Sequence, residues 1–227
     1  MKRNPKPKHW SYSALSTFEQ CPKRWHYQKI ERLPDPGGPH LERGKLVHEM
    51  LERATLAKRM VSKNLPSGWV AEVVKRYRKM PALRTEQKLF LDRAWENLPP
   101  DPDRFMPSRT WLMAVLDILA AGFFADWKTG KVYTDKHEDQ MHLYATALAS
   151  ITGVLHWVGE LVYVDQECVE ELEFDFREDG ALEEAQNYWN ERAARLQSEK
   201  KFPKRPTKLC GWCPYHKSKG GPCSGQD

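Results

Sequence analysis

The sequence predicts a single α/β domain, and three observations support that prediction. The chain has 227 residues, which is enough to bury one sizeable core. Apolar residues recur at helical spacing in several segments, and short apolar runs around a turn indicate strands. Hydrophobic residues make up 40% of the chain and charged residues 30%. That balance is typical of a globular protein and excludes a fibrous or membrane-embedded one.

Helices are predicted for most of the first 80 residues. A helical segment with hydroxyl caps begins near Ser11 and runs through Cys21 to a break rich in proline and glycine at residues 33–38. A second, amphipathic helix is predicted over 44–60 and carries His48, and a third over 69–77. The periodicity over 85–98 fits no single element, and a proline-rich connection follows at 99–107.

The segment from Trp111 to Thr129 predicts a β-hairpin. Two short apolar runs surround a turn at residues 121–122, so the numbers of paired residues sum to 243. This register places Asp117 opposite Asp126, with their Cβ atoms about 5 Å apart on one face of the sheet. Alternation along the strand adds Lys128 to that face. Two acids and a lysine are therefore expected to converge.

Carboxylates that share a face repel each other unless one is protonated or a cation lies between them. Paired oxygen ligands of this kind hold Mg²⁺ or Mn²⁺, and the neighbouring Lys128 is suited to offset negative charge that builds on a phosphate. The alternative is a surface hairpin whose Asp and Lys side chains are only solvated, because D-x-K triplets are common.

The remaining elements alternate between helix and strand. A helix is predicted over 135–151, with Gln140 and Tyr144 one turn apart on one face. These two residues would otherwise be ordinary helix residues, with Tyr144 packed on the sheet. Strands over 154–164 and 171–176 and a helix over 182–196 complete the domain.

Charge and cysteines are concentrated near the ends of the chain. Residues 1–9 contribute +4 and residues 199–227 contribute +5, so the middle carries −4. Basic ends around an acidic body suit a protein that contacts a polyanion and binds a cation. Five cysteines are an odd number, and with no apolar leader after the basic N-terminus we expect a cytoplasmic, reducing location and free or metal-bound thiols rather than disulfides. No segment is expected to span a membrane.

Several motifs occur in one order along most of the chain. They are Ser11-Tyr-Ser-Ala-Leu, Cys21-Pro-Lys-Arg-Trp, Gly44-Lys-Leu-Val-His48-Glu, Asp117, Asp126-Trp-Lys128-Thr-Gly130, Gln140-Met-His-Leu-Tyr144 and Cys210-Gly-Trp-Cys213-Pro. This ordered set resembles the PD-(D/E)XK nuclease superfamily, and in particular its RecB/AddB-like branch and the CRISPR-associated adaptation exonucleases that carry an iron-sulfur cluster. The resemblance implies a restriction-endonuclease-like fold, with a central mixed β-sheet flanked by helices and a C-terminal cysteine cluster segment.

The resemblance also implies roles for individual residues. His48, Asp117, Asp126 and the main-chain carbonyl of Trp127 would bind Mg²⁺ or Mn²⁺, although a histidine on an amphipathic helix is more often a surface or core residue. Lys128 would be the catalytic lysine, supported by Gln140 and Tyr144. Glu86 resembles an acid that precedes the metal-binding hairpin in these proteins.

Four cysteines are implied as ligands of a 4Fe-4S cluster, namely Cys21, Cys210, Cys213 and Cys223. Zn²⁺ is the alternative, because thiolates suit both. The gap between Cys213 and Cys223 is longer than in the family, which makes His216 a substitute ligand to consider. Cys168 is expected to be a free buried thiol, and the segment around the last three cysteines has too little apolar content to pack unaided.

The predicted organisation is one nuclease domain over 1–227. It comprises a helical segment at 1–40, a nuclease core at 41–198, and a basic linker with the cluster segment at 199–227. The predicted function is metal-dependent hydrolysis of DNA, as an exonuclease on single strands or ends in recombination or repair, with recombination proteins as partners. The alternatives are a DNA-binding or adaptor protein that does not cleave, and a zinc-stabilised structural protein.

Overall fold

A five-stranded mixed sheet forms the centre of the molecule. The computed structural model describes residues 6–35 and 37–225. The strands lie in sequence order across the sheet, and only β3 and β4 pair in parallel, so the predicted mixed sheet is confirmed. Their bounds are β1 Arg84–Leu91, β2 Leu112–Ala120, β3 Phe123–Lys128, β4 His156–Tyr163 and β5 Cys168–Asp175.

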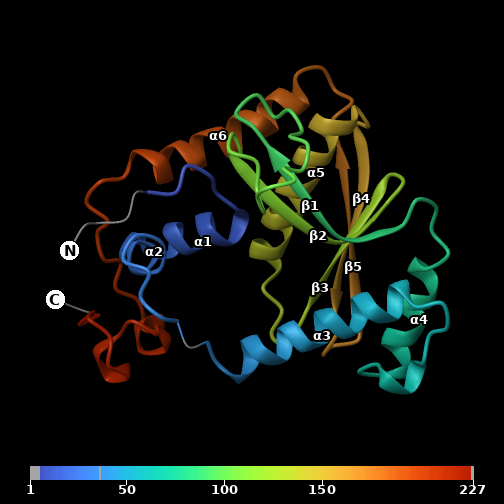
Figure 1. The fold of residues 1–227 in the computed structure, drawn as a ribbon, viewed down its shortest axis with the longest axis horizontal. Coiled ribbons are helices and arrows are strands. Elements are labelled where there is room, and N and C mark those ends of the chain that lie inside the picture. The colour runs from blue at the N-terminus through green and yellow to red at the C-terminus, as the bar shows by residue number, and fades with distance from the viewer. Residues whose placement is uncertain (1–5, 36, 226–227) are drawn as a thin grey trace.

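Helices cover both faces of this sheet (Figure 1). Helices α3 and α4 bury Val47 and Val70 against Ile118 and Trp127 on one face. On the other face α1, α5 and α6 pack against Leu116 and Phe124, among others. Helix α5 is also the crossover that a parallel pair such as β3 and β4 requires. The helix bounds are α1 Tyr12–Gln20, α2 Pro22–Lys29, α3 Pro39–Leu56, α4 Gly68–Tyr77, α5 Thr134–Thr152 and α6 Ala181–Ser198.

The structure divides the predicted N-terminal helix into two. Ser11 caps α1 as its hydroxyl suggested, because its Oγ accepts a hydrogen bond from Ala14 N at 3.4 Å. Cys21 then adopts an extended conformation between α1 and α2. Proline disfavours helical geometry in the residue before it, so Pro22 accounts for the break and begins α2. The thiol of Cys21 is thereby placed at a corner rather than on a helix face.

The hairpin forms in the predicted register. Ile118 pairs with Ala125 and Ala120 with Phe123, around a turn in which Gly122 has a φ of +68°. A tight turn needs a residue that tolerates positive φ, and Gly122 meets that need. The pairing of β2 with β3 stops at Ile118 and Ala125, one step before Asp117 and Asp126.

The ambiguous segment 85–98 contains β1, which pairs antiparallel with β2. Leu112, Ala114 and Leu116 of β2 face the α5 side, whereas Ile118 faces the α3–α4 side. The alternation of faces therefore shifts at Asp117. Directly opposite lies Glu86, a non-glycine residue with a φ of +46°. Such backbone conformations are uncommon and concentrate at functional sites.

The two ends of the chain pack against each other (Figure 1). Lys6 Nζ donates hydrogen bonds to the carbonyls of Gln197 and Glu199, at 2.9 and 2.8 Å. The Phe202 ring stacks on Trp25 with centroids 5.6 Å apart. Lys2 and Arg3 of the basic N-terminus lie outside the described residues. In the part of the chain that is described, no helix is long and apolar enough to cross a membrane.

Candidate active site

Three carboxylates lie in a row across three neighbouring strands. Thr85 pairs with Ile118 and Gln87 with Leu116, so Glu86 lies opposite Asp117. The β2–β3 register brings Asp126 opposite Asp117 from the other side. Where direct strand pairing ends, Asp117 Oδ2 accepts a hydrogen bond from Trp127 N at 2.8 Å. The Asp117 carboxylate thus accepts the Trp127 N–H in place of a backbone carbonyl, at the point where β2 and β3 cease to pair.

These residues line a cavity of about 600 Å³ between the sheet, α3 and α5. Every residue that the sequence predicted for the metal and nuclease site borders it. They are His48, Glu86, Asp117, Asp126, Trp127, Lys128, Gln140 and Tyr144. Helix α3 further contributes His40, Gly44, Lys45, Glu49 and Glu52 to the lining. The individual roles assigned to these residues stay predictions.

His48, Glu86 and Asp117 form the group that fits a metal ion. One ligand atom from each lies within 4.8 Å of the others. His48 Nδ1 is 3.2 Å from Asp117 Oδ1, with the ring partly buried. A donor set of carboxylate oxygens and one imidazole nitrogen suits Mg²⁺ or Mn²⁺, and the imidazole shifts preference toward Mn²⁺. Glu86, which the sequence indicated least directly, therefore belongs to this group of three ligands.

Asp126 faces Lys128 and α5 instead. Lys128 Nζ lies 2.5 Å from Asp126 Oδ2 and 2.8 Å from Gln140 Oε1. Gln140 Nε2 donates to Tyr144 Oη at 2.6 Å. The i, i+4 pair on α5 thus holds the lysine from one side while Asp126 holds it from the other. The amine is fixed beside the three acids.

Burial and neighbouring charges shift the pKa values of Glu86, Asp126 and His48. Burial raises the pKa of Glu86, and the charges of Asp117 and Glu52 raise it further. Burial also raises the pKa of Asp126, which the charge of Lys128 opposes. Burial lowers the pKa of His48, but its hydrogen bond to Asp117 and the nearby acids outweigh burial, so the pKa is raised overall. A bound cation relieves the repulsion between carboxylates that are crowded in this way.

A second set of contacts, which the sequence did not reveal, holds α3 to the loop after Lys128. Asp165, in the β4–β5 turn, accepts from Arg43 Nη1 at 2.8 Å and from Gly130 N at 2.7 Å. Arg43 lies on α3 five residues before His48, and Gly130 lies two residues after Lys128. No local pattern marks this three-way contact, because its members are distant in sequence.

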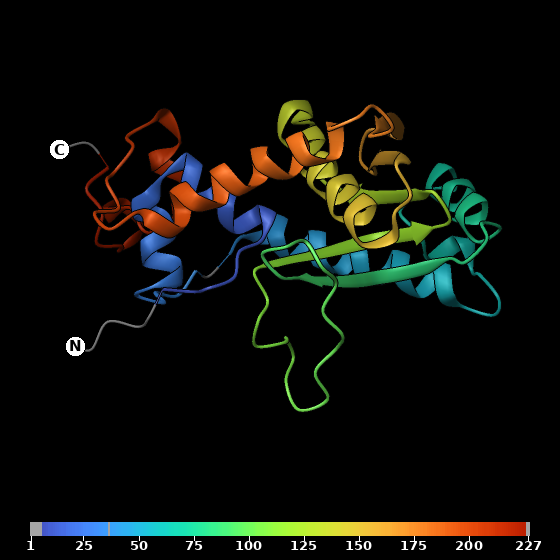
Figure 2. The ribbon, with the colours of Figure 1, turned by 90° about the horizontal axis from the view of Figure 1, so that it is seen from above.

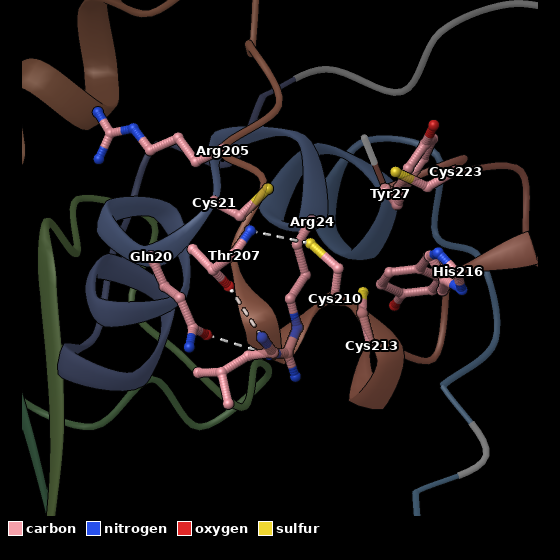
Figure 3. A pocket seen from close by; sticks show the side chains of 13 residues that line it. Gln20, Cys21, Arg24, Tyr27, Arg205, Thr207, Cys210, Cys213, His216 and Cys223 are labelled. Atoms are coloured by element: carbon pink, nitrogen blue, oxygen red, sulfur yellow. Dashed lines mark hydrogen bonds between the residues drawn. The ribbon is translucent and has the colours of Figure 1, made fainter. Parts of the chain in front are cut away.

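The four predicted cluster cysteines meet in another cavity, between α1, α2 and the C-terminal segment. Cys21, Cys210, Cys213 and Cys223 all line it, and in Figure 3 their sulfur atoms face a common space. Among the described residues, no three cysteine sulfurs lie within 4.8 Å of one another. Four thiolates about 2.3 Å from one Zn²⁺ would lie about 3.8 Å apart. The cysteines are thus set wider than a zinc site requires.

The residues between Cys213 and Cys223 form a loop that brings Cys223 back beside Tyr215. The chain makes a short 3₁₀ turn at Lys217–Lys219 and returns, so that Cys223 N donates to Tyr215 O at 2.9 Å. Tyr215 is buried and packs on Tyr27 of α2, with centroids 5.5 Å apart. This tyrosine supplies the apolar contact that the segment was expected to lack. His216 also lines the cavity, so both fourth ligands considered from the sequence are present.

Cys168 is a free cysteine as expected, but the expectation that it is buried was wrong. Cys168 is the first residue of β5 and is exposed rather than buried. At this end β5 pairs only with β4, so the far side of the strand faces solvent. Cys168 is not among the residues that line the cysteine cavity.

Fold and site together define a protein of the nuclease class, with an acid-acid-lysine group on a mixed sheet. A sequence profile of the PD-(D/E)XK nuclease superfamily matches residues 9–218, and the chain belongs to this superfamily. A search of curated proteins gave no match. Among solved structures, the one titled "Crystal structure of SSO0001" is 14% identical, with a TM-score of 0.49, over 93% of this chain and 85% of that one.

Proposed function

We propose that this protein is a metal-dependent DNA exonuclease that acts on single strands or DNA ends during recombination or repair. Membership of the superfamily supports phosphodiester hydrolysis, and the convergence of His48, Glu86 and Asp117 beside Lys128 is the observation that carries the proposal. His48, Glu86 and Asp117 would hold Mg²⁺ or Mn²⁺, with Asp126 and the Trp127 carbonyl completing the set. The metal would supply Lewis acidity and lower the pKa of bound water.

The protein's own groups then act on the substrate. Lys128 is held by Asp126 and Gln140 at distances of 2.5 and 2.8 Å, so its ammonium is oriented before DNA enters. It would stabilise the negative charge that develops on the phosphate during attack. Tyr144 accepts a hydrogen bond from Gln140 and so helps to fix the side chain that holds Lys128. Preorganised positive charge of this kind needs little rearrangement during the reaction.

Digestion of labelled oligonucleotides tests this proposal. With Mn²⁺, we expect linear single strands to be degraded from an end and circular single strands to persist. Asp117→Asn should abolish both metal binding and cleavage. Rapid cleavage of the circle would show an endonuclease. Binding of DNA without any cleavage, in Mg²⁺ or Mn²⁺, would favour the non-cleaving adaptor protein.

We also propose a 4Fe-4S cluster bound by Cys21, Cys210, Cys213 and Cys223. The wide setting of the sulfurs supports it, because a four-iron cube spreads its thiolates further than one zinc ion does. Arg24 and Arg205 border the cavity and suit the negative charge of such a cluster. Thiolates must stay reduced to bind iron, so a reducing, cytoplasmic setting is part of the proposal.

The visible spectrum separates iron from zinc. Anaerobically purified protein should be brown, with broad visible absorption, and replacing any of the four cysteines with Ala should bleach it. Cys168→Ala is the matched control and should keep the colour. A colourless protein containing one equivalent of zinc would support the zinc-stabilised alternative. Bleaching by His216→Ala but not by Cys223→Ala would move the fourth ligand to His216.

A further inference from the structure

The tail of the chain carries a large aromatic side chain that neither cavity uses. Trp212 is 79% exposed, whereas seven of the nine tryptophans in the sequence are buried. Its exposed fraction is the highest among the large apolar side chains of the described residues. Leu209, on the same short turn, is the neighbouring exposed apolar residue.

The position of Trp212 is fixed by the cysteine segment. It ends the 3₁₀ turn Lys208–Trp212, which has Thr207 as its capping residue. Cys210 and Cys213 on either side of it both line the cysteine cavity. Lys219 Nζ donates to Trp212 O at 3.1 Å and lies 5.9 Å from the centre of the indole ring. The indole is therefore presented from an ordered turn with a cation beside it.

Along the chain on both sides of Trp212, charge is of one sign. Lys208, Lys217 and Lys219 are all exposed, and residues 200–225 contain no Asp or Glu. Glu199, the nearest acid along the chain, accepts backbone hydrogen bonds from residues 200–202. An exposed aromatic ring among cations is complementary to an anionic partner with planar groups.

The tail also contacts the segment that connects α2 to α3. Tyr215 Oη donates to Leu33 O at 3.4 Å, in the segment that enters α3. The first turns of α3 carry His40 and Gly44, which line the active-site cavity. In Figures 1 and 2 the red tail lies beside α2, from which the chain runs on to α3.

We propose that Trp212 stacks on a base of single-stranded DNA while Lys208, Lys217 and Lys219 contact its phosphates. Because it names DNA as the ligand, this inference deepens the proposed function and rests on it. Every base has a face on which an aromatic ring can stack, so binding of this kind tolerates any sequence. In a duplex those faces are already covered by neighbouring bases. The surface therefore favours a single strand and would retain it next to the catalytic cavity.

Binding without cleavage tests the proposal. The full chain is titrated with fluorescein-labelled oligo-dT in EDTA, and anisotropy gives the Kd. Trp212→Ala should weaken binding by about 5- to 150-fold, the effect of losing one stacked base. Trp212→Phe should recover most of the affinity. Leu209→Ala removes a neighbouring apolar side chain and should bind as the wild type does.

An oligomer of the same length made of abasic sites separates stacking from charge. It keeps the phosphates, so Trp212→Ala and wild type should bind it equally. Lys217→Ala should lower the slope of log Kd against log salt by about one. Visible absorption and the thermal midpoint of each variant show whether the cysteine segment is intact.

Three results would overturn the inference. They are an unchanged Kd for Trp212→Ala, an equal loss on the abasic oligomer, and an equal loss in Leu209→Ala, which would indicate an apolar surface for a protein partner. These outcomes are independent of the proposed enzymatic activity, because the assay contains no divalent metal. A protein that binds through Trp212 yet never cleaves DNA would refute the nuclease proposal alone.

Discussion

Lys128 is the residue that we propose stabilises the negative charge on the phosphate during cleavage. It lies between Asp126 and Gln140, and its side chain is only 14% exposed. Lys128→Ala should reduce the rate of DNA cleavage by about 10²- to 10³-fold, as removal of one transition-state hydrogen-bond donor does. The Kd for DNA in EDTA should stay near the wild-type value. Single-turnover cleavage with Mn²⁺ measures the first quantity and anisotropy the second.

Lys131 provides the matched control for that substitution. It lies three residues further along the chain, and it is exposed rather than held by an acid. Lys131→Ala should cleave at the wild-type rate. An equal loss in both variants would mean that Lys128 acts through general positive charge rather than through its position.

The pKa of His137 responds to the positive charge of Lys128. It packs on Tyr163, with its Nδ1 3.2 Å from the tyrosine oxygen. Burial, followed by the charges of Lys128 and Lys136, lowers its pKa to about 4. The unfolded chain takes up this proton near pH 6.5 and the folded chain only near 4. This histidine therefore favours unfolding as pH falls from 6.5 to 4, and it has no effect on stability above pH 6.5.

Titration of His137 by NMR measures that shift directly. We expect a midpoint of about 4 in the wild type. In Lys128→Met the midpoint should move upward, because a charge that disfavours imidazolium has been removed. A wild-type midpoint near 6.5 would contradict the packing described for this side chain.

At the scale of elements, Asp165 joins α3 to the loop that follows Lys128. Both partners of the ion pair are partly exposed, so Asp165→Asn should cost at most about 1 kcal/mol of folding stability. Its effect on function should be larger, because Arg43 and Gly130 set the separation of His48 and Lys128. We expect a higher Mn²⁺ concentration at half-maximal cleavage with little change in thermal midpoint.

The pair Asp175 and Arg177 offers a control for the loss of an ion pair. Both side chains are well exposed, on β5 and just after it, away from either cavity. Asp175→Asn should leave the Mn²⁺ dependence unchanged. If the two variants behave alike, Asp165 contributes no positioning.

Elements with a strong local pattern could be predicted from the sequence, and those defined by distant contacts could not. The hairpin was predictable because its turn and apolar runs fix the register, and Asp117, Asp126 and Lys128 all line one cavity. Strand β1 was ambiguous because Glu86 interrupts its alternation with a positive φ. The position of Glu86 opposite Asp117 depends on pairing across the 92–111 loop, which no local rule specifies. Cys168 was placed wrongly because the edge position of β5 depends on the order of all five strands.

At the scale of the whole molecule, the tail depends on one close approach. A Cβ added to Gly221 would lie 2.2 Å from the carbonyl carbon and the carbonyl oxygen of Tyr215, which are backbone atoms and cannot move aside as a flexible side chain can. Gly221→Ala should therefore detach residues 210–225 from α2. We expect faster proteolysis of the tail and loss of any bound metal centre, measured by limited trypsin digestion and visible absorption.

Gly211→Ala tests whether that effect is specific to the close approach. A Cβ at position 211 would meet no atom within 4 Å, although this glycine lies in the same cysteine segment, between Cys210 and Cys213. The variant should resist trypsin as the wild type does. Equal sensitivity of the two variants would show that the tail tolerates no side chain at either glycine.

Because Glu86, Asp117 and Asp126 lie in a row on three strands, the site is especially sensitive to insertions and deletions in those strands. Each acid is placed by a count of residues along its own strand, so deleting one residue between 112 and 128 would turn an acid to the opposite face of the sheet. The mostly exposed residues 99–107 of the connection before the hairpin carry no such count, so a change of length there should have less effect. Insertions and deletions in the gene are thus strongly constrained within the hairpin and more weakly constrained in the exposed part of the loop before it.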